Sequence, residues 1–383
     1  MEDKVKVTDE QKNVHDMLQE RVRLKISIIG IGNAGNQLLN EAMGKEGFKI
    51  FAINSSWKDL QNSVVDSSID SFIIGDQGRG AAKYREVSKK AFNDSKEKMA
   101  SSVPAFDTIC NYADVIVVAG ATGGGTGSGV CPEMIRYLKE HYPRKIVIFA
   151  GILPRLSSSV HDQENSIGCM KEIDELGIPY ILADLEHYSG VNNDVAYKDI
   201  QQYLMKCIEI IAGKYLQNST LGMIDENDMR VIIGQPGYMS IYGVENVKQT
   251  TLDTTTLQSL LIEKIKNSPA APIMRDRVIR QMGVILDVAS DMHDPAMASD
   301  YKELTEYIGR PITIYENYSN VSQANAQMFI ILSGQTQPYN RINQMKEIAD
   351  EGKENLNKVK KFDLESMVKD SITANETIPD FLL

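Results

Sequence analysis

Nearly continuous apolar runs recur through the first half of the chain, each followed by a glycine-rich or polar stretch and a helix-like segment. The runs are RLKISIIG, FKIFAINSS, ADVIVVAG, RKIVIFAGILP and PYILADLEHY. They lack the alternation of apolar and polar positions that a half-exposed strand shows. Strands of this kind are typical of a parallel sheet that helical connections cover on both faces, so the pattern predicts an α/β fold.

The pattern also divides the chain. An apolar stripe at helical spacing predicts a long, half-buried helix at 195–217, and its members are Ile200, Leu204, Ile208 and Ile211. After residue 218, shorter strands and helices alternate as far as residue 337. We therefore expect these parts: an N-terminal helix at 1–23, a first α/β domain at 24–194, the long helix at 195–217, a smaller α/β domain at 218–337 and a helical or flexible tail at 338–383 that is dispensable for folding.

The composition is that of an ordinary globular protein, since 42% of the 383 residues are apolar and 24% are charged. The net charge of −11 disfavours direct binding to nucleic acid. The four cysteines form no CxxC pair, which disfavours a metal cluster and a disulfide framework. The polar start and the lack of about 20 consecutive apolar residues disfavour a signal peptide and a membrane span, so we expect a cytoplasmic protein.

Two turns from a predicted strand to a predicted helix are rich in glycine. They are GIGNAG at 30–35 and GGGTGSG at 123–129, and GDQGRGAA at 75–82 is a weaker third. The N–H groups of such a turn point outward at the positive end of a helix, which makes an anion site, most often for phosphate. The sequence therefore predicts a nucleotide site.

The glycines have other possible roles. Gly30, Gly32 and Gly35 match the dinucleotide pattern GxGxxG, but the next strand ends at Asn54 rather than at the acid that a nicotinamide-dependent oxidoreductase needs for the ribose. No Walker A sequence is present. Tight turns alone would explain GIGNAG, but five glycines in seven residues carry an entropic cost that we do not expect packing to justify.

The same loops carry a family resemblance. GGGTGSG is the signature loop of the tubulin and FtsZ superfamily of GTPases, and GIGNAGNQ resembles its first loop. IGDQGRGAAKYREVSKKAF and GILPR resemble the third and fifth loops of TubZ, the plasmid and phage branch. The resemblance covers about residues 24–335. It implies a tubulin/FtsZ-like fold with a Rossmann-type parallel-sheet GTPase domain at 24–194, a long central helix and a smaller α/β C-terminal domain.

The resemblance also implies residues that bind GTP or GDP, with Mg²⁺ as a companion. Those expected around the phosphates and the base edge are Gly32, Asn33, Ala34, Gln37, Gly123, Gly124, Gly125, Thr126 and Gly127. Gly78 and Arg79 would approach the γ-phosphate, and Asn54 is included in the predicted site.

In the long helix, Tyr197 would stack on guanine and Gln201, one turn later, would bind the edge of the base. Alignment with FtsZ gives that role to Asp199 instead, and a solvated helix face is the alternative for all three. The fifth loop departs from FtsZ, because RLSSSVHDQENS has no clear ribose-binding Glu and Arg. Asp162 or Glu164 would contact the ribose, and His161 is expected at the surface.

Hydrolysis needs a polar or acidic group that orients water at the γ-phosphate. In the tubulin family it comes from the next subunit, from the loop after the central helix. The matching stretch here places Asp225 and Asp228 in the catalytic role, with Gly237 nine residues beyond Asp228. Capping of a helix that starts near residue 226 is a compatible alternative role for Asp225.

Taken together, the resemblance predicts a GTPase that assembles head to tail into filaments and moves plasmid or phage DNA through a DNA-binding adaptor protein. FtsZ-like cell division is the alternative within the family, and the C-terminal TIPDFLL resembles the tail peptide of FtsZ. A nicotinamide-dependent oxidoreductase and a GTP-binding scaffold without hydrolysis are the alternatives from other classes.

Overall fold

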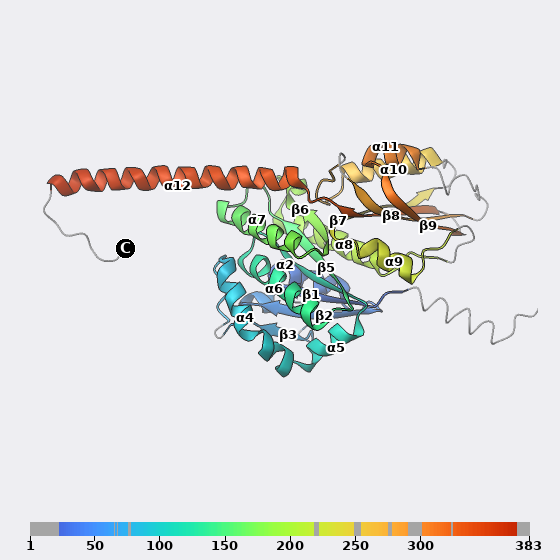
Figure 1. Cartoon of the computed structure of the whole chain (residues 1–383), viewed down its shortest axis with the longest axis horizontal. Helices are drawn as coiled ribbons and strands as arrows, with labels where there is room; N and C mark the ends of the chain where they lie inside the picture. Colours follow the sequence, from blue (N-terminus) through green and yellow to red (C-terminus); the bar gives the residue numbers. More distant parts are fainter. Residues whose placement is uncertain are drawn as a thin grey trace, which may run out of the picture.

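The structure, a computed structural model, describes residues 23–64, 66, 68–75, 78–217, 222–248, 254–274, 278–289, 301–322 and 325–373. Apart from Arg23, the N-terminal helix expected at 1–23 lies outside these residues, and so does the C-terminal TIPDFLL. The described strands form one sheet in the order β3-β2-β1-β4-β5-β6-β7-β10-β8-β9. Figure 1 shows the sheet with its helices and one long helix, α12, that projects from the body.

The first half of the sheet is parallel, as the apolar runs predict. Its strands are β1 (Ile26–Ile31), β2 (Phe48–Asn54), β3 (Ser71–Ile73), β4 (Val115–Ala121), β5 (Ile146–Leu153) and β6 (Pro179–Asp184). Alternate residues of β4 belong to two different apolar clusters, Val117 to one and Val118 to the other. The strand is therefore buried on both faces, which explains why its sequence shows no polar alternation.

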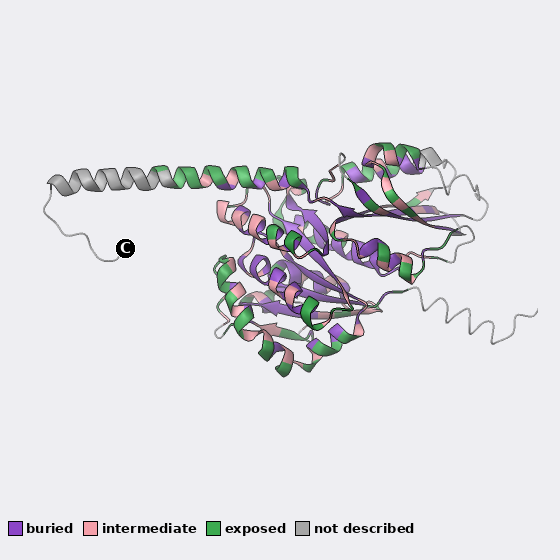
Figure 2. Ribbon diagram, in the orientation of Figure 1, coloured by how far each residue is buried: buried purple, intermediate pink, exposed green. Residues whose placement is uncertain are grey.

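Each of those two clusters lies between the sheet and a layer of helices. One layer contains α2 (Gly32–Ala42), α3 (Trp57–Ser63) and α8 (Asn193–Ile211). The other contains α4 (Arg85–Ser102), α5 (Pro104–Tyr112), α6 (Gly125–His141) and α7 (Val160–Glu175). Figure 2 shows the buried residues concentrated in the strands and on the inner faces of these helices.

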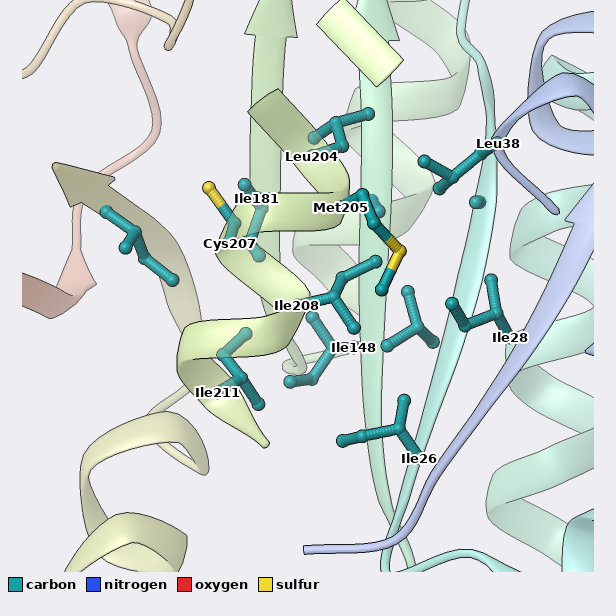
Figure 3. Close-up of a cluster of buried hydrophobic side chains, with 14 of the residues drawn as sticks. Ile26, Ile28, Leu38, Ile148, Ile181, Leu204, Met205, Cys207, Ile208 and Ile211 are labelled. Carbon is teal, nitrogen blue, oxygen red and sulfur yellow. The ribbon is translucent and has the colours of Figure 1, made fainter. Parts of the chain in front are cut away.

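Helix α8 is the long central helix. Its predicted stripe packs on the sheet, where Leu204, Ile208 and Ile211 meet β1 and β5 residues such as Ile26 and Ile148 (Figure 3). The helix ends at Ile211, before the expected residue 217, because Gly213 adopts a left-handed conformation (φ 78°) that stops it.

The second half of the chain adds α9 (Glu226–Ile233), β7 (Gly237–Lys248), α10 (Thr254–Lys266), β8 (Ile279–Ala289), α11 (Lys302–Ile308), β9 (Pro311–Ser322) and β10 (Asn325–Gln335). Apart from α9, whose buried residues belong to the same cluster as Val117, these elements enclose a third apolar cluster. Strand β7 continues the first half of the sheet through two pairs, Pro179 with Gly237 and Tyr180 with Tyr238. The smaller domain expected at 218–337 therefore has its own core but shares the sheet.

Helix α12 (Tyr339–Thr373) begins inside the body. Arg341 is 3% exposed and donates from Nε to Asp184 at 2.6 Å and from Nη2 to the same carboxylate at 3.0 Å. Met345 and Ala349, one and two turns later, are buried as well. The start of the tail thus belongs to the folded core, which corrects the expectation that everything after 337 is dispensable for folding.

Candidate nucleotide-binding site

A cavity of about 820 Å³ opens at the carboxyl ends of the parallel strands. Ile31, Asn54, Ala121 and Ile152 line it, and each lies at or next to the end of its strand. Ligands of open α/β sheets bind at this edge, because the loops that leave the strands meet there. Most of the predicted nucleotide site lines this cavity: Gly32, Asn33, Ala34, Gln37, Asn54, Arg79, Gly123, Gly124, Gly125, Thr126, Gly127 and Tyr197.

The first turns of α2 and α6 face this cavity. Neither helix has a capping side chain, and neither has an acidic residue in its first turn. A helix leaves its first N–H groups without acceptors inside the helix, and in α6 these belong to Gly125, Thr126 and Gly127. Two positive helix ends at one cavity make a site for an anion with more than one charged group.

The glycines of the 123–129 loop are there chiefly because close neighbours leave no room for a Cβ atom. A Cβ on Gly125 would lie 2.7 Å from the backbone of Lys83, and those on Gly127 and Gly129 would collide with the carbonyls of Ala121 and Arg85. Packing therefore explains more of this loop than the sequence led us to expect. Gly124 is the exception, since nothing lies within 4 Å of its Cβ position.

Buried amides tie the loops after β1 and β2 together. The Asn36 amide, oriented to satisfy its neighbours, donates to Gly30 O at 2.7 Å and accepts from Asn54 Nδ2 at 3.1 Å. Asn54 in turn accepts from the N–H of Ser55 at 2.8 Å. Ser55 then bonds to the hydroxyl of Thr126 at 2.7 Å. Asn54 thus lines the cavity, but its amide is used to shape the loop that orients Thr126.

The third loop supplies the positive side chains of the cavity lining, Arg79 and Lys83. Gly78, expected beside them, does not line the cavity; it packs against Trp57 and accepts the N–H of that residue at 3.1 Å. The sequence reading missed Lys83, which follows the glycines rather than lying among them. Its backbone is left-handed (φ 66°), and so is that of Ala82 (φ 46°).

Helix α7 packs against the end of the third loop, at Lys83. Ser159 caps the helix by accepting from the N–H of Asp162 at 3.2 Å, and its hydroxyl donates to the Asp162 carboxylate at 2.7 Å. Asp162 lines the cavity, whereas Glu164, the other candidate for the ribose, pairs with Lys353 at 2.9 Å. His161 is partly exposed but has a specific contact, a 3.0 Å hydrogen bond between Nε2 and the carbonyl of Lys83.

The start of α8 bounds the other end of the cavity. Tyr197 lines it, and burial raises the pKa of its phenol, so the ring is a neutral, flat surface. Gln201 donates from Nε2 to Oε1 of Gln37 at 2.9 Å and so lies behind Gln37 rather than in the lining. Asp199 is exposed and outside the lining, while Asp194, which sequence reasoning missed, is part of it.

Asp225 and Asp228 lie at the N-terminus of α9 and form a reciprocal capping box. Asp225 accepts from the N–H of Asp228 at 2.8 Å, and its own N–H donates to Asp228 at 3.2 Å. Arg230 of the same helix donates to Asp114 at 2.8 Å, and Asp114 immediately precedes β4. The capping role is thus present, and α9 is held at the amino ends of the strands, as Figure 1 also shows.

This arrangement can bind a polyphosphate and a flat base, but the chain does not bring its two predicted catalytic acids to the cavity. The cavity and α9 lie at opposite ends of β4, and seven residues at about 3.3 Å each separate them by roughly 20 Å. Among the described residues, no three His, Cys, Asp or Glu side chains gather in a way that would hold a metal ion. None of the described helices has the length and apolar character needed to cross a membrane.

Comparison with known proteins assigns the cavity to a family. Residues 25–184, which contain the first, third and fifth loops and the signature loop at 123–129, match the Tubulin/FtsZ family, GTPase domain. These residues therefore resemble a Tubulin/FtsZ GTPase domain. The helices and glycine loops that line the cavity, apart from the start of α8, all lie within the matched residues.

Two curated relatives match parts of the chain. The cell division protein FtsZ of Aquifex aeolicus (strain VF5) is 24% identical over 230 residues, which are 57% of this chain and 59% of the relative. The tubulin-like protein TubZ of Clostridium botulinum C phage is 28% identical over 150 residues, or 39% of this chain and 40% of the relative. The chain thus spans less than two thirds of the length of either relative.

Solved structures extend the likeness to the whole fold. TubZ of Clostridium botulinum phage c-st covers 87% of this chain and 99% of its own, with a TM-score of 0.67 and 18% identity. The match to a GTPγS-form protofilament of TubZ from Bacillus thuringiensis serovar israelensis covers 97% of this chain and 100% of that chain, with a TM-score of 0.70 and 16% identity. The predicted tubulin/FtsZ-like fold is therefore confirmed, with both α/β parts and the central helix in place.

Proposed function

We propose that this protein binds and hydrolyses GTP and assembles head to tail into filaments. The observation that carries the proposal is the separation of the site into two halves. The glycine loops lie at the carboxyl ends of the strands, and Asp225 and Asp228 lie at the amino ends. When one copy places its α9 on the cavity of the next, a complete hydrolytic site forms at each junction.

Binding of the nucleotide would follow the geometry of the cavity. The N–H groups of the first turns of α2 and α6 would surround the α- and β-phosphates, with Thr126 adding a hydroxyl that Ser55 orients. Tyr197 would stack on guanine, and the amide of Gln37, held by its bond to Gln201, would bind the edge of the base. Mg²⁺ fits a site without a carboxylate cluster, because it is commonly bound by phosphate oxygens, waters and one or two carboxylates.

Hydrolysis would depend on a carboxylate of the next copy. Asp225 is exposed, and its capping bond to Asp228 holds the carboxylate at one orientation. A carboxylate held in this way can orient the water that attacks the γ-phosphate, which is the main protein contribution to phosphoryl transfer besides charge stabilisation. The GTPγS-form protofilament of the structurally similar TubZ supports assembly of this kind.

Positioning of plasmid or phage DNA in the cytoplasm is the cellular role that we infer. The support is the resemblance of the third and fifth loops to TubZ, together with the match to a phage TubZ. A chain with a net charge of −11 would bind DNA through an adaptor protein rather than directly. Cell division is the second candidate, because the match to FtsZ of Aquifex aeolicus extends over more residues.

Two measurements test the proposal. Nucleotide released by denaturing the purified protein should be guanine nucleotide, and NAD in its place would indicate an oxidoreductase. The rate of phosphate release per molecule should rise steeply with protein concentration, in step with the polymer that pellets with GTP. A scaffold without catalysis would pellet but release no phosphate, and a rate per molecule that stays constant on dilution would place the whole active site within one chain.

A further inference from the structure

Lys83 adopts a backbone conformation that side chains rarely tolerate. It and Ala82 are consecutive non-glycine residues with φ of 66° and 46°, in the left-handed region that favours glycine. The same loop has glycines with left-handed backbone at 78 and 80, so glycine is used where only the turn matters. A strained lysine at a cavity wall indicates that its side chain has a role there.

Several contacts from elsewhere in the fold hold Lys83 in that conformation. Its carbonyl accepts from Asn165 Nδ2 at 2.8 Å and lies 3.0 Å from Nε2 of His161, both on α7. The same Asn165 amide donates to Gly123 O at 3.0 Å. The Lys83 backbone also lies 2.7 Å from the position that a Cβ of Gly125 would take. These contacts fix the position of Lys83 next to the turn that begins α6, where the phosphates are expected.

Among the described residues, the ammonium group of Lys83 pairs with Asp162 alone. Nζ lies 3.1 Å from both carboxylate oxygens of Asp162. The lysine side chain is 62% exposed and the aspartate side chain 15%, and both residues line the cavity. An ion pair with such an exposed lysine contributes little stability, because water and counterions compete for the ammonium group. A phosphate group, with more charge than one carboxylate, would compete well for the same ammonium.

We propose that Lys83 senses the terminal phosphate of the bound nucleotide by leaving Asp162 for it. This inference rests on the proposed function, since it assumes that guanine nucleotides bind in the cavity. With a nucleoside diphosphate the Lys83–Asp162 pair stays closed and bridges the third loop to α7. With a nucleoside triphosphate the ammonium moves to the γ-phosphate and releases the Asp162 carboxylate, so the pair reports which nucleotide is present.

Competition binding of GTPγS and GDP against a fluorescent GDP derivative tests the exchange, at protein concentrations too low for assembly. Lys83→Met should weaken GTPγS about tenfold or more, in keeping with the loss of one charged hydrogen bond, and change GDP affinity much less. Asp162→Asn should act in the opposite direction, since Lys83 then has no competing partner. The ratio of GTPγS to GDP affinity should rise about two- to fivefold, because this factor corresponds to the free energy of an exposed ion pair.

The double variant separates exchange from a general charge effect. In the Lys83→Met background, Asp162→Asn should no longer change the affinity ratio, because the ammonium whose competition it relieves is absent. Glu86→Gln removes a carboxylate that is 74% exposed, pairs with Arg85 and lies outside the cavity lining, and it should leave the ratio of GTPγS to GDP affinity at the wild-type value. Thermal unfolding of each variant without nucleotide shows whether it is folded.

The proposal is overturned if Lys83→Met weakens GTPγS and GDP equally or weakens neither. It is also overturned if Asp162→Asn still raises the affinity ratio in the double variant. Failure of the proposed function gives a different result, because the wild-type protein then binds neither guanine nucleotide at any concentration used.

Discussion

Asp225 and Gly124 of one chain lie at opposite ends of strand β4, and no change of side-chain rotamer brings them together. Gly124 immediately precedes α6 at the carboxyl end of the strand. Asp225 begins α9, which the Arg230–Asp114 ion pair holds at the amino end. On the proposed function, binding and catalysis therefore belong to different ends of the molecule, and assembly would join them.

Gly124 offers a cleaner test of the phosphate site than its neighbours. Its backbone (φ −75°, ψ 160°) suits any residue, and its Cβ position is open. Gly124→Val should keep the thermal unfolding temperature of the wild type but lose GTP binding, because the side chain occupies the space expected for phosphate oxygens. Equilibrium binding of a fluorescent GTP derivative measures the effect.

Gly125→Val is the matched comparison. It should also abolish binding, but with a lower unfolding temperature, because its Cβ meets the Lys83 backbone at 2.7 Å. Wild-type affinity in Gly124→Val would show that phosphate does not lie beside this residue.

The sequence predicts the parallel sheet and the central helix well, because strands buried on both faces and a single apolar stripe leave unambiguous patterns. It also predicts the glycine loops, through a resemblance specific enough to name them. Lys83 could not be predicted in the same way. No local preference assigns a left-handed backbone to Lys or Ala, and the contacts that impose it come from Asn165 and His161, about 80 residues later.

The start of the tail was missed for a related reason. Its many charges predict a solvated helix, but Arg341, Met345 and Ala349 at helical spacing form a buried stripe among them. A charged member of such a stripe can be recognised only once its partner, Asp184, is known to lie opposite.

Recognition of the base would depend on Gln37, which lines the cavity, and on Gln201 behind it. Gln201→Leu leaves Gln37 without its 2.9 Å partner, so GTP should lose affinity relative to ATP and the preference for guanine should fall. An unsatisfied buried polar group costs about 1–3 kcal/mol, which corresponds to roughly 5- to 150-fold in selectivity. Asp199→Asn, on the exposed face of the same helix, should leave selectivity unchanged. Competition binding of GTP and ATP measures the selectivity of each variant. Loss of selectivity in Asp199→Asn alone would favour the FtsZ-like alignment.

Truncation separates the two parts of the tail. Ending the chain after Gln337 removes Arg341 and leaves the buried Asp184 carboxylate unpaired, which should cost about 3–5 kcal/mol of folding stability. Ending it after Leu356 keeps the Arg341 pair and the Lys353–Glu164 contact, so the unfolding temperature should stay close to that of the full chain. Thermal unfolding measures both, and equal stability of the two truncations would contradict the assignment of Arg341 to the core.

Low pH should reduce the stability of the fold in part through Glu172, whose carboxylate joins α7 to α4 and α6. Burial alone would raise the pKa of this carboxyl, but Arg85 and Lys89 outweigh it and lower the pKa below the ordinary value of 4.5. Its stabilising effect is therefore present above pH 4.5 and is lost as the pH falls through the lowered value. Glu172→Gln should be less stable than the wild type at neutral pH, and the difference in unfolding temperature should shrink in acid. Glu175→Gln, whose side chain is 60% exposed, is the control and should show no such convergence.

The two half-sites can be separated by mutation and then recombined. Gly124→Val should bind no GTP but keep the α9 acids. Asp225→Asn should bind GTP and assemble, and asparagine still caps α9, so any loss of hydrolysis reflects the carboxylate rather than the cap. The expected loss in rate for Asp225→Asn is on the order of 10²- to 10⁴-fold.

Phosphate release from a mixture of these two variants is the most direct test of a site shared between copies. Wherever α9 of a Gly124→Val subunit covers the nucleotide of an Asp225→Asn subunit, one complete site forms. The mixture should therefore release phosphate at a rate that neither variant shows alone and that rises with the fraction of mixed junctions. A mixture that pellets as joint filaments yet releases no more phosphate than the separate variants would contradict the account.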